Sequence, residues 1–508
     1  MTPKGLPEWA LINSLEPSPY EPGGLYLAAT RYKSDDFQPY LYKTSDYGAT
    51  WTRIDAGIDR EHFTRVVRAD PVRRGLLFAG TERGLYLSWD DGASWQPFQQ
   101  NLPLVPVTDL TIREGSLYAA TQGRAFWALD DLPLLRQWPL APASDEAALF
   151  TPAPVLRLRG PADPQPAPDA GTDPPNGVAV FYRLAKAPEK PIELAFLGAG
   201  GKVLRRFASE PPKKTDPGAE AKDAKKDAQK EDRSAEAKAG EPKKETPGEV
   251  KAAGKDEKKG GEAKEAKKAD KKGKKEKKAP AEAGLNRFVW DLRLEEADDF
   301  PGLILWNGRL SGPKVPPGRY QVRLTDGGTV ETADFTVAPD PRGTSSQRDL
   351  EAQYDFLVAA RDKLSAAHRA IRFLRDALGR LDGLAERMEG DDKKDLREAA
   401  DALRKRLLGV EEALYQTKLE SQQDPLNFPI RLNDKLAGVA SVVAAGDARP
   451  TDSALAVRDE LFAAIDRQLA TLNEITEKDL PAFEEKAHAA GVTLLPAKPA
   501  ETAPPETP

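Results

Sequence analysis

The sequence contains no cysteine and only three histidines among its 508 residues. The absence of cysteine excludes disulfides, iron–sulfur clusters, thiolate zinc sites and cysteine nucleophiles. The histidines His62, His368 and His488 lie far apart in the sequence, so a zinc site with two or three histidine ligands is not expected. No apolar run approaches the ~18 residues of a membrane span, and the first eight residues lack the apolar core of a signal peptide. We therefore expect a soluble chain that carries no export signal of its own.

Common catalytic motifs are missing as well. The sequence has no phosphate-binding loop, no dinucleotide-binding glycine pattern and no His-Glu-x-x-His helix. We therefore expect no cofactor and no metal.

Charge is concentrated in one segment. The chain carries 75 basic and 81 acidic residues, for a net charge of −6. Residues 211–283 alone hold 23 basic and 17 acidic side chains, with no aromatic residue and Val250 as the single large aliphatic one. Such a segment cannot bury enough apolar surface to offset the entropy of ordering, so we predict a disordered insert.

The insert allows a second interpretation. A lysine-rich arm can bind nucleic acid or an anionic surface. However, the interleaved acids weaken its field, and there are no aromatic side chains to stack on bases. We therefore favour a solvated insert without a nucleic-acid partner.

The most specific pattern is a repeat near the amino terminus. The motif [ST]-x-D-x-G-x-[ST]-W occurs at residues 44–51 and again at 88–95. Similar apolar segments precede the two copies, and a third such segment is followed by a degenerate copy ending at 126–131. A repeat of ~40–50 residues with short strands and turns is typical of propeller blades.

Each position of the motif has a physical role. The aspartate can accept hydrogen bonds from backbone N–H groups of its own turn. The glycine supplies a backbone conformation that other residues avoid, and the tryptophan packs beneath the hairpin. These roles fall on Asp46 and Asp90, on Gly48 and Gly92, and on Trp51 and Trp95.

This motif is an Asp-box and resembles the BNR repeat of sialidases, sortilin-type receptors and xyloglucanase-like glycoside hydrolases. The flanking segments 31–40, 65–71 and 123–131 are similar to bacterial sortilin-like or WD40/YVTN/BNR-like repeat proteins known as glycosyl hydrolases. The resemblance implies that this chain matches only their carboxy-terminal half. It also implies a periplasmic or secreted location, or a cytoplasmic one if the chain is expressed as written. Gln122 stands where the family pattern has histidine, which weakens any proposal that the last blade offers a catalytic histidine.

The number of blades points to an incomplete propeller. Residues 1–140 hold about three blades, whereas a closed propeller needs at least ~4. An open end would expose unpaired strand edges. We therefore expect a partial β-propeller that is completed by a missing half or by a partner protein.

Residues 150–340 alternate in the manner of β-strands. We predict strands at 178–184, 192–197, 202–207, 286–293, 316–324 and 332–337. This part resembles the Ig-like β-sandwich of flagellar hook-capping and cell-surface proteins, which implies that Trp290 fills the core and that Tyr320 is buried near a strand start. The insert would then lie between two consecutive strands, where loop closure tolerates its length.

Residues 344–490 have helical periodicity. We predict a long helix capped near 344–346, a second from about 391, a short one at 432–445 and a last one capped at 450–452. The result is a helical bundle with coiled-coil character that could self-associate. We expect His368 and His488 on solvated or partly buried faces, and a disordered tail at 496–508.

Glycoside hydrolysis needs two carboxylates that flank one bond. The weak catalytic candidates in the blade region are Asp35, Asp36, Asp70 and Asp109. Because every specific motif here is structural, we favour a chain that is not an enzyme.

Three functions remain open at this point. The favoured one is a non-catalytic interaction or carbohydrate-contacting module with a protein partner or a polysaccharide. The second is half of a xyloglucanase-like glycoside hydrolase that is inactive alone. The third is a binder of nucleic acid or an anionic surface through the lysine-rich insert.

Overall fold

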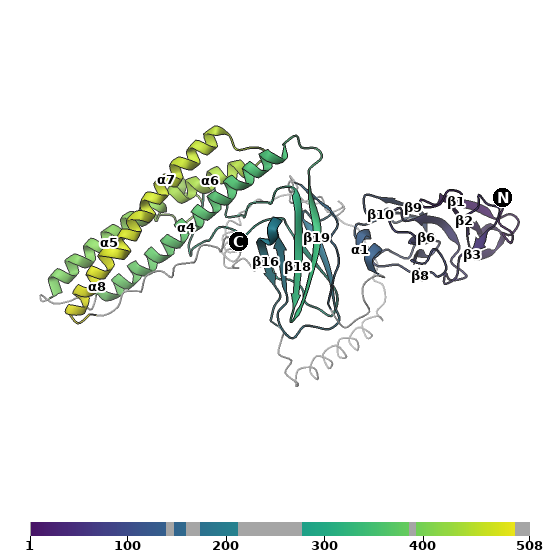
Figure 1. Cartoon of the computed structure of the whole chain (residues 1–508), viewed down its shortest axis with the longest axis horizontal. Coiled ribbons are helices and arrows are strands. Elements are labelled where there is room, and N and C mark those ends of the chain that lie inside the picture. The colour runs from purple at the N-terminus through teal and green to yellow at the C-terminus, as the bar shows by residue number, and fades with distance from the viewer. Residues whose placement is uncertain (1, 139–146, 159–172, 212–276, 386–392, 493–508) are drawn as a thin grey trace, which may run out of the picture.

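The computed structural model describes residues 2–138, 147–158, 173–211, 277–385 and 393–492. Figure 1 shows three parts in chain order: a β-rich part at the amino-terminal end, a second β-rich part in the middle and helices at the other end. The predicted tail at 496–508 and most of the predicted insert lie outside the described residues. No helix in the described ranges is long and apolar enough to cross a membrane.

The amino-terminal part consists of three antiparallel sheets, each with its strands in up-and-down order. The first contains β1 (Leu11–Pro17), β2 (Leu25–Arg31), β3 (Asp36–Thr44) and β4 (Thr52–Arg53). The second contains β5 (Thr64–Ala69), β6 (Leu77–Thr81), β7 (Gly84–Ser88) and β8 (Gln96–Pro97). The third contains β9 (Val107–Arg113), β10 (Ser116–Thr121) and β11 (Phe126–Leu129), and the short helix α1 (Leu132–Gln137) follows it. The three predicted blades correspond to these three sheets.

Neighbouring sheets pack through their first strands. Strand β5 contacts β1 and β2 of the first sheet, and β9 contacts β5 and β6 of the second. The approach is close at Gly80, where a Cβ atom would lie 2.6 Å from Val66 Cγ1 and 2.8 Å from the Val107 carbonyl oxygen. A larger residue would therefore push β9 away from β6. Separate cores fill the two spaces between the sheets.

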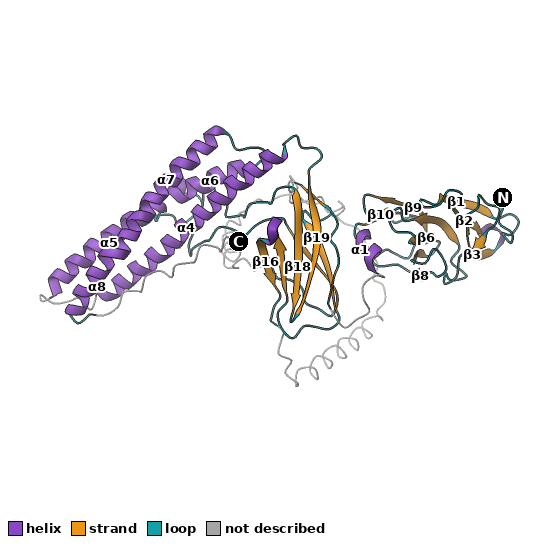
Figure 2. Cartoon of the chain, in the orientation of Figure 1, coloured by secondary structure: helices purple, strands orange, loops and turns teal. Residues whose placement is uncertain are grey.

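The middle part consists of two sheets that share one hydrophobic core. Figure 2 shows its strands between the amino-terminal part and the helices. One sheet has the order β12 (Ala148–Leu149), β14 (Val178–Leu184) and β17 (Gly284–Trp290). The other has the order β13 (Val155–Arg157), β19 (Thr329–Pro339), β18 (Gly318–Asp326), β15 (Glu193–Leu197) and β16 (Val203–Ala208). All six predicted strands are present, with small shifts at their ends; β12 and β13 were not predicted.

The two aromatic residues singled out in this part lie where the sequence predicts them. Trp290 is fully buried in the shared core, where its ring stacks on Phe196 with centroids 4.4 Å apart. Tyr320 is buried near the start of β18, and its hydroxyl donates a hydrogen bond of 2.7 Å to the Pro316 carbonyl oxygen.

The predicted carboxy-terminal boundary of the disordered insert is wrong. Residues 277–283 are described, and Ala279 lies buried in the shared core. Its N–H donates a hydrogen bond of 3.1 Å to the carbonyl oxygen of Ala208, the last residue of β16. Alternation could not reveal this contact, because a small alanine in a charged segment does not resemble a core residue. The insert thus lies between β16 and β17 in the sequence.

The carboxy-terminal part contains five α-helices in the described residues. They are α4 (Gln347–Ala385), α5 (Lys394–Leu414), α6 (Leu432–Ala444), α7 (Asp452–Glu474) and α8 (Leu480–Ala489). A π-helical turn, Ile475–Asp479, joins the last two. Two predicted caps are confirmed: Ser346 Oγ accepts from the Asp349 N–H at 3.2 Å, and Thr451 Oγ1 accepts from the Ala454 N–H at 3.2 Å.

The expectation for His368 is wrong. This histidine is fully buried under the segment that follows β17, which crosses α4 and contributes Phe300 to the helical core. The carbonyl oxygen of Asp298 can only accept, so the His368 Nδ1–H donates to it. The other ring nitrogen, Nε2, then accepts from the Asn433 side-chain amide at 3.2 Å. Helical periodicity cannot predict that a segment from elsewhere in the chain buries this residue. His488 is exposed.

Candidate functional site

The Asp-box turns connect β3 to β4 and β7 to β8. In the first turn, Asp46 accepts hydrogen bonds from the Thr50 N–H at 2.8 Å and from the Thr50 hydroxyl at 2.6 Å. The Thr44 hydroxyl donates to Asp46 at 2.8 Å and accepts from the Gly48 N–H at 3.0 Å. The aspartate therefore closes its own turn through three donors.

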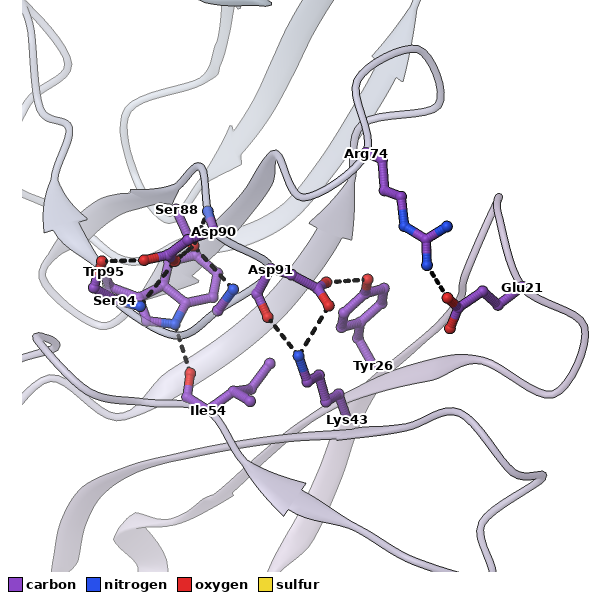
Figure 3. A network of polar contacts seen from close by, with 11 residues as sticks. Glu21, Tyr26, Lys43, Ile54, Arg74, Ser88, Asp90, Asp91, Ser94 and Trp95 are labelled. Atoms are coloured by element: carbon purple, nitrogen blue, oxygen red, sulfur yellow. Dashed lines mark hydrogen bonds and ion pairs between the residues drawn. The ribbon is translucent and has the colours of Figure 1, made fainter. Parts of the chain in front are cut away.

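The second turn repeats this geometry (Figure 3). Asp90 accepts from the Ser94 N–H at 2.8 Å and from the Ser94 hydroxyl at 2.5 Å. The Ser88 hydroxyl donates to Asp90 at 2.7 Å and accepts from the Gly92 N–H at 2.9 Å. Two turns 44 residues apart thus use the same side chains in the same way.

The glycines of the two turns have left-handed backbones. Gly48 and Gly92 have φ of 83° and 84°, and each follows a non-glycine residue that is also left-handed. At Gly92 space is limiting too, because a Cβ atom would lie 2.8 Å from Ile54 Cδ1. Glycine is therefore required there for its conformation and for its size.

The hydrogen bonds of the turns stabilise the ionised carboxylates. The side-chain hydrogen bond from Thr50 is the largest cause that lowers the pKa of Asp46 to about 2. Burial acts to raise the pKa of Asp90, but the hydrogen bonds from Ser94 and Ser88 outweigh it and the net direction is downward. A carboxyl group held ionised in this way is a poor general acid near neutral pH.

The two motif tryptophans lie in different surroundings. Trp95 is buried between the first and second sheets, and its Nε1–H donates to the Ile54 carbonyl oxygen at 2.5 Å. Trp51 is only partly buried and lies on the outward face of the first sheet, beside Leu27 and Tyr42. The difference arises because the first sheet packs over Trp95, whereas no sheet of the described part packs over Trp51.

A polar network joins the second Asp-box turn to the first sheet (Figure 3). Asp91 accepts from the Tyr26 hydroxyl at 2.5 Å and pairs with Lys43 Nζ at 2.9 Å. Lys43 also donates to the Asp91 carbonyl oxygen at 3.2 Å. Nearby, Arg74 pairs with Glu21. No local pattern distinguishes Asp91 in the sequence, because its partners lie 48 and 65 residues away.

The structure does not bring the four catalytic candidates together. Asp35 is exposed after a 3-10 turn and has a left-handed backbone. Asp36 accepts from the Tyr40 hydroxyl at 2.6 Å. Asp109 pairs with Arg68 at 2.7 Å.

The fourth candidate, Asp70, is fully buried. It accepts from Arg136 of α1 at 2.8 Å and from the N–H groups of Val72 and Arg73 at 2.8 and 2.6 Å. These partners make it an anchor for α1. Within the described ranges, the four candidates share no hydrogen-bond partner, and no group of three or more histidine, aspartate or glutamate residues could hold a metal ion.

The outward face of the first sheet is apolar and open. Ile12 and Leu15 of β1 lie opposite Ala29 and Leu27 of β2, and Leu15 is 56% exposed. A groove of about 530 Å³ runs along this face. Its lining comprises Thr2, Pro3, Ile12, Leu15, Gly23, Gly24, Leu25, Leu27, Thr44, Tyr47, Gly48 and Trp51.

The outward face of the third sheet is also partly apolar. Tyr118 of β10 lies opposite Ala128 of β11, and Ala120 lies opposite Phe126. Phe126 is 84% exposed. The opposite face, with Leu117 and Trp127, packs toward the second sheet. Both ends of the three-sheet stack therefore present apolar side chains.

Comparisons with known proteins give weak structural likenesses. No protein-family model and no curated protein matches the sequence. A GH74 enzyme of Niastella koreensis is 19% identical, with a TM-score of 0.20 over 24% of this chain and 21% of that one. YCF48 from Cyanidioschyzon merolae is 11% identical, with a TM-score of 0.20 over 40% and 58%. YCF48 bound to D1 peptide is 13% identical, with a TM-score of 0.19 over 37% and 50%. The chain thus spans less than two thirds of each, and its function has to be inferred from its own residues.

Proposed function

We propose that residues 2–138 form a non-catalytic interaction module. Its three sheets are an arc of propeller blades, and further blades complete the arc. Those blades come from a missing half of the same protein or from a separate partner. The observation that carries this proposal is the open apolar face of the first sheet, with Leu15 and its neighbours along the groove.

The interfaces inside the chain indicate what this face would bind. The first and second sheets bury apolar side chains against each other, with Tyr26 and Ala28 on one side and Val67 and Leu77 on the other. The second and third sheets do the same. The outward face of the first sheet continues the series through Leu27 and the residues beside it. A further blade would bury this face in the same manner.

The energy of burial favours such a partner. Removing apolar surface from water contributes roughly 25 cal/mol per Å², and contiguous exposed apolar patches often mark interaction sites. Trp9, just before β1, is 88% exposed, and tryptophan is enriched among the residues that anchor interfaces. The exposed Phe126 offers an anchor at the other end of the arc.

The carboxylates support the non-catalytic part of the proposal. Asp70 and Asp109 are ion-paired with arginines, and Asp36 is bonded to Tyr40. The Asp-box carboxylates are used within their own turns. A general acid or base has to exchange protons with a substrate, and these groups have protein partners instead.

The test uses the full chain and a second purified polypeptide. This second polypeptide is the product of the neighbouring upstream reading frame, if that frame encodes further Asp-boxes. We expect a 1:1 complex in size-exclusion chromatography with light scattering. Leu15→Glu should weaken the complex by at least about tenfold, because a buried unpaired charge is strongly unfavourable.

Val72→Glu is the matched control, because Val72 is an exposed apolar residue in the loop after β5 of the second sheet and does not line the groove. This variant should bind as the unmodified chain does. A complex that forms equally well with Leu15→Glu would contradict the proposal. So would a failure of the two unmodified polypeptides to associate.

A further inference from the structure

A second cavity lies in the helical part, remote from the three amino-terminal sheets. Its volume is about 400 Å³, and it is enclosed by α4, α6 and the segment 293–313 that crosses them. This volume falls within the ~300–1,000 Å³ of small-molecule sites. The proposed interaction module does not use it.

The crossing segment is held firmly against the helices. The N–H groups of Trp306 and Asn307 donate to the buried Asp434 carboxylate at 2.7 and 3.3 Å. Gly308 lies so close to α6 that a Cβ atom would be 2.3 Å from Ala437 Cβ. The wall of the cavity is therefore preorganised, which lowers the entropic cost of binding.

Most of the cavity lining on the helices is apolar, apart from Arg361 of α4 and Ser441 of α6. Leu357, Ala360 and Leu364 of α4 line it, together with Leu436 and Ala440 of α6. These side chains offer no hydrogen bonds, so this side suits a hydrocarbon group.

The rest of the lining includes polar and positively charged side chains. Arg293, Arg309 and Arg361 contribute to the cavity, and none of the lining residues is acidic. The Arg361 guanidinium pairs with the adjacent Asp362 at 2.6 Å. Arg293 donates to the Gly312 carbonyl oxygen at 2.9 Å. In the described ranges, Arg309 has no hydrogen bond or ion pair. The Arg293 guanidinium has no ion pair there, although the Arg293 N–H donates to the Asp291 carboxylate at 3.2 Å.

The neighbourhood of Arg293 has excess positive charge. Lys314 forms a β-bridge with Arg293. Burial is the main cause that lowers the pKa of Lys314 to about 8. The charges of Arg293 and Arg157 act in the same direction and outweigh those of Asp447 and Asp291, which raise it. An anion placed beside Arg293 would offset this repulsion.

We propose that this cavity binds a small anionic amphiphile, with a carboxylate held by Arg309 and Arg293 and a short hydrocarbon chain on the apolar side. Guanidinium groups match a carboxylate through paired N–H donors. The arginines would select for the charge, and the leucines and alanines for the apolar chain.

Isothermal titration calorimetry of the full chain with octanoate tests this proposal. Two probes separate the parts of the ligand: 1-octanol has the chain without the charge, and acetate has the charge without the chain. We expect octanoate to bind at least about tenfold more tightly than 1-octanol, because loss of a charged hydrogen-bonding partner typically has an effect of that order. We expect a difference of at least about the same size from acetate, because acetate has no chain to bury.

Three variants locate the binding. Arg309→Gln removes an exposed guanidinium and should weaken octanoate binding by about tenfold while the melting temperature stays unchanged. Ala440→Phe fills the apolar side and should prevent binding. Arg467→Gln, which changes an exposed arginine on α7, should bind octanoate normally.

Several results would overturn the proposal. These are no heat of binding with octanoate, equal binding of 1-octanol, or undiminished binding in Arg309→Gln. An equal loss of affinity in Arg467→Gln would show attraction to general surface charge and would also overturn it. Because Arg309→Gln changes an exposed side chain, the test does not depend on whether Ala440→Phe folds.

Discussion

The hydroxyl group of Tyr26 in the first sheet donates a 2.5 Å hydrogen bond to Asp91 in the second Asp-box turn. Lys43 holds the other carboxylate oxygen of Asp91 at 2.9 Å. A turn that closes one hairpin therefore also fixes the neighbouring sheet. Asp90 closes the hairpin turn, and the adjacent Asp91 attaches that turn to the first sheet.

Removing this link should weaken the packing between the first two sheets. We expect Tyr26→Phe to lower the free energy of unfolding by about 1 kcal/mol, since a hydrogen bond to a charged group is lost at a partly buried site. Urea denaturation monitored by tryptophan fluorescence measures the change. Tyr118→Phe, at an exposed tyrosine of the third sheet, is the control and should be neutral. Equal stabilities of the two variants would show that the Tyr26 bond contributes nothing.

Alanine should destabilise the fold more at the Asp-box glycine Gly92 than at a glycine in open space. Gly92 and Gly123 have φ of 84° and 83°, so alanine brings a left-handed strain of about 1–2 kcal/mol at both. At Gly92 the new Cβ would also lie 2.8 Å from Ile54, whereas nothing lies within 4 Å at Gly123. Gly92→Ala should therefore lower the melting temperature more than Gly123→Ala. The reverse order would refute the packing described around Ile54.

The first Asp-box should contribute stability that depends on acid pH. The pKa of Asp46 is lowered from 3.8 to about 2, so the folded state binds a proton less tightly than the unfolded state. Its contribution is complete above about pH 4 and is lost as the pH falls toward 2. Thermal melts between pH 2 and 5 should show a shallower decline for Asp46→Asn. Asp35→Asn controls for the change in net charge, and a decline as shallow in that variant would exclude a special role for Asp46.

The buried histidine should make the helical part sensitive to mild acid. Burial lowers the pKa of His368 below its ordinary 6.5, although the Asp298 carbonyl acts in the other direction. The unfolded state therefore takes up a proton more readily, and stability falls as the pH drops below about 6.5. His368→Gln stays neutral and should remove this slope in melts followed by circular dichroism. His488→Gln, at an exposed position, should keep it; loss of the slope in both variants would contradict the assignment.

Local pattern and tertiary contact were not equally predictable from the sequence. Alternation predicts β14 with the bounds that the structure has, and the caps at Ser346 and Thr451 follow from residue type. By contrast, β12 and β13 have only two and three residues, and strands this short show no recognisable alternation of apolar and polar residues. β13 also pairs in parallel with β19, far along the chain.

In the candidate site, too, local contacts could be predicted from the sequence and distant contacts could not. The turn chemistry of Asp46 and Asp90 involves neighbours within four residues, so the motif itself contains the information. The ion pair of Asp70 with Arg136 spans 66 residues, and the cover over His368 comes from 70 residues away. Such contacts depend on topology, which no local pattern specifies.

The hydrogen bond between Ala279 and Ala208 has a practical consequence. It holds the two ends of the insert side by side, and Lys278 pairs with Glu210 at 3.4 Å beside it. A folded guest domain whose own termini lie close together could replace residues 212–276 without stretching β16 or β17. The junction would then serve as an insertion point for a fluorescent reporter, remote in sequence from the groove of the first sheet.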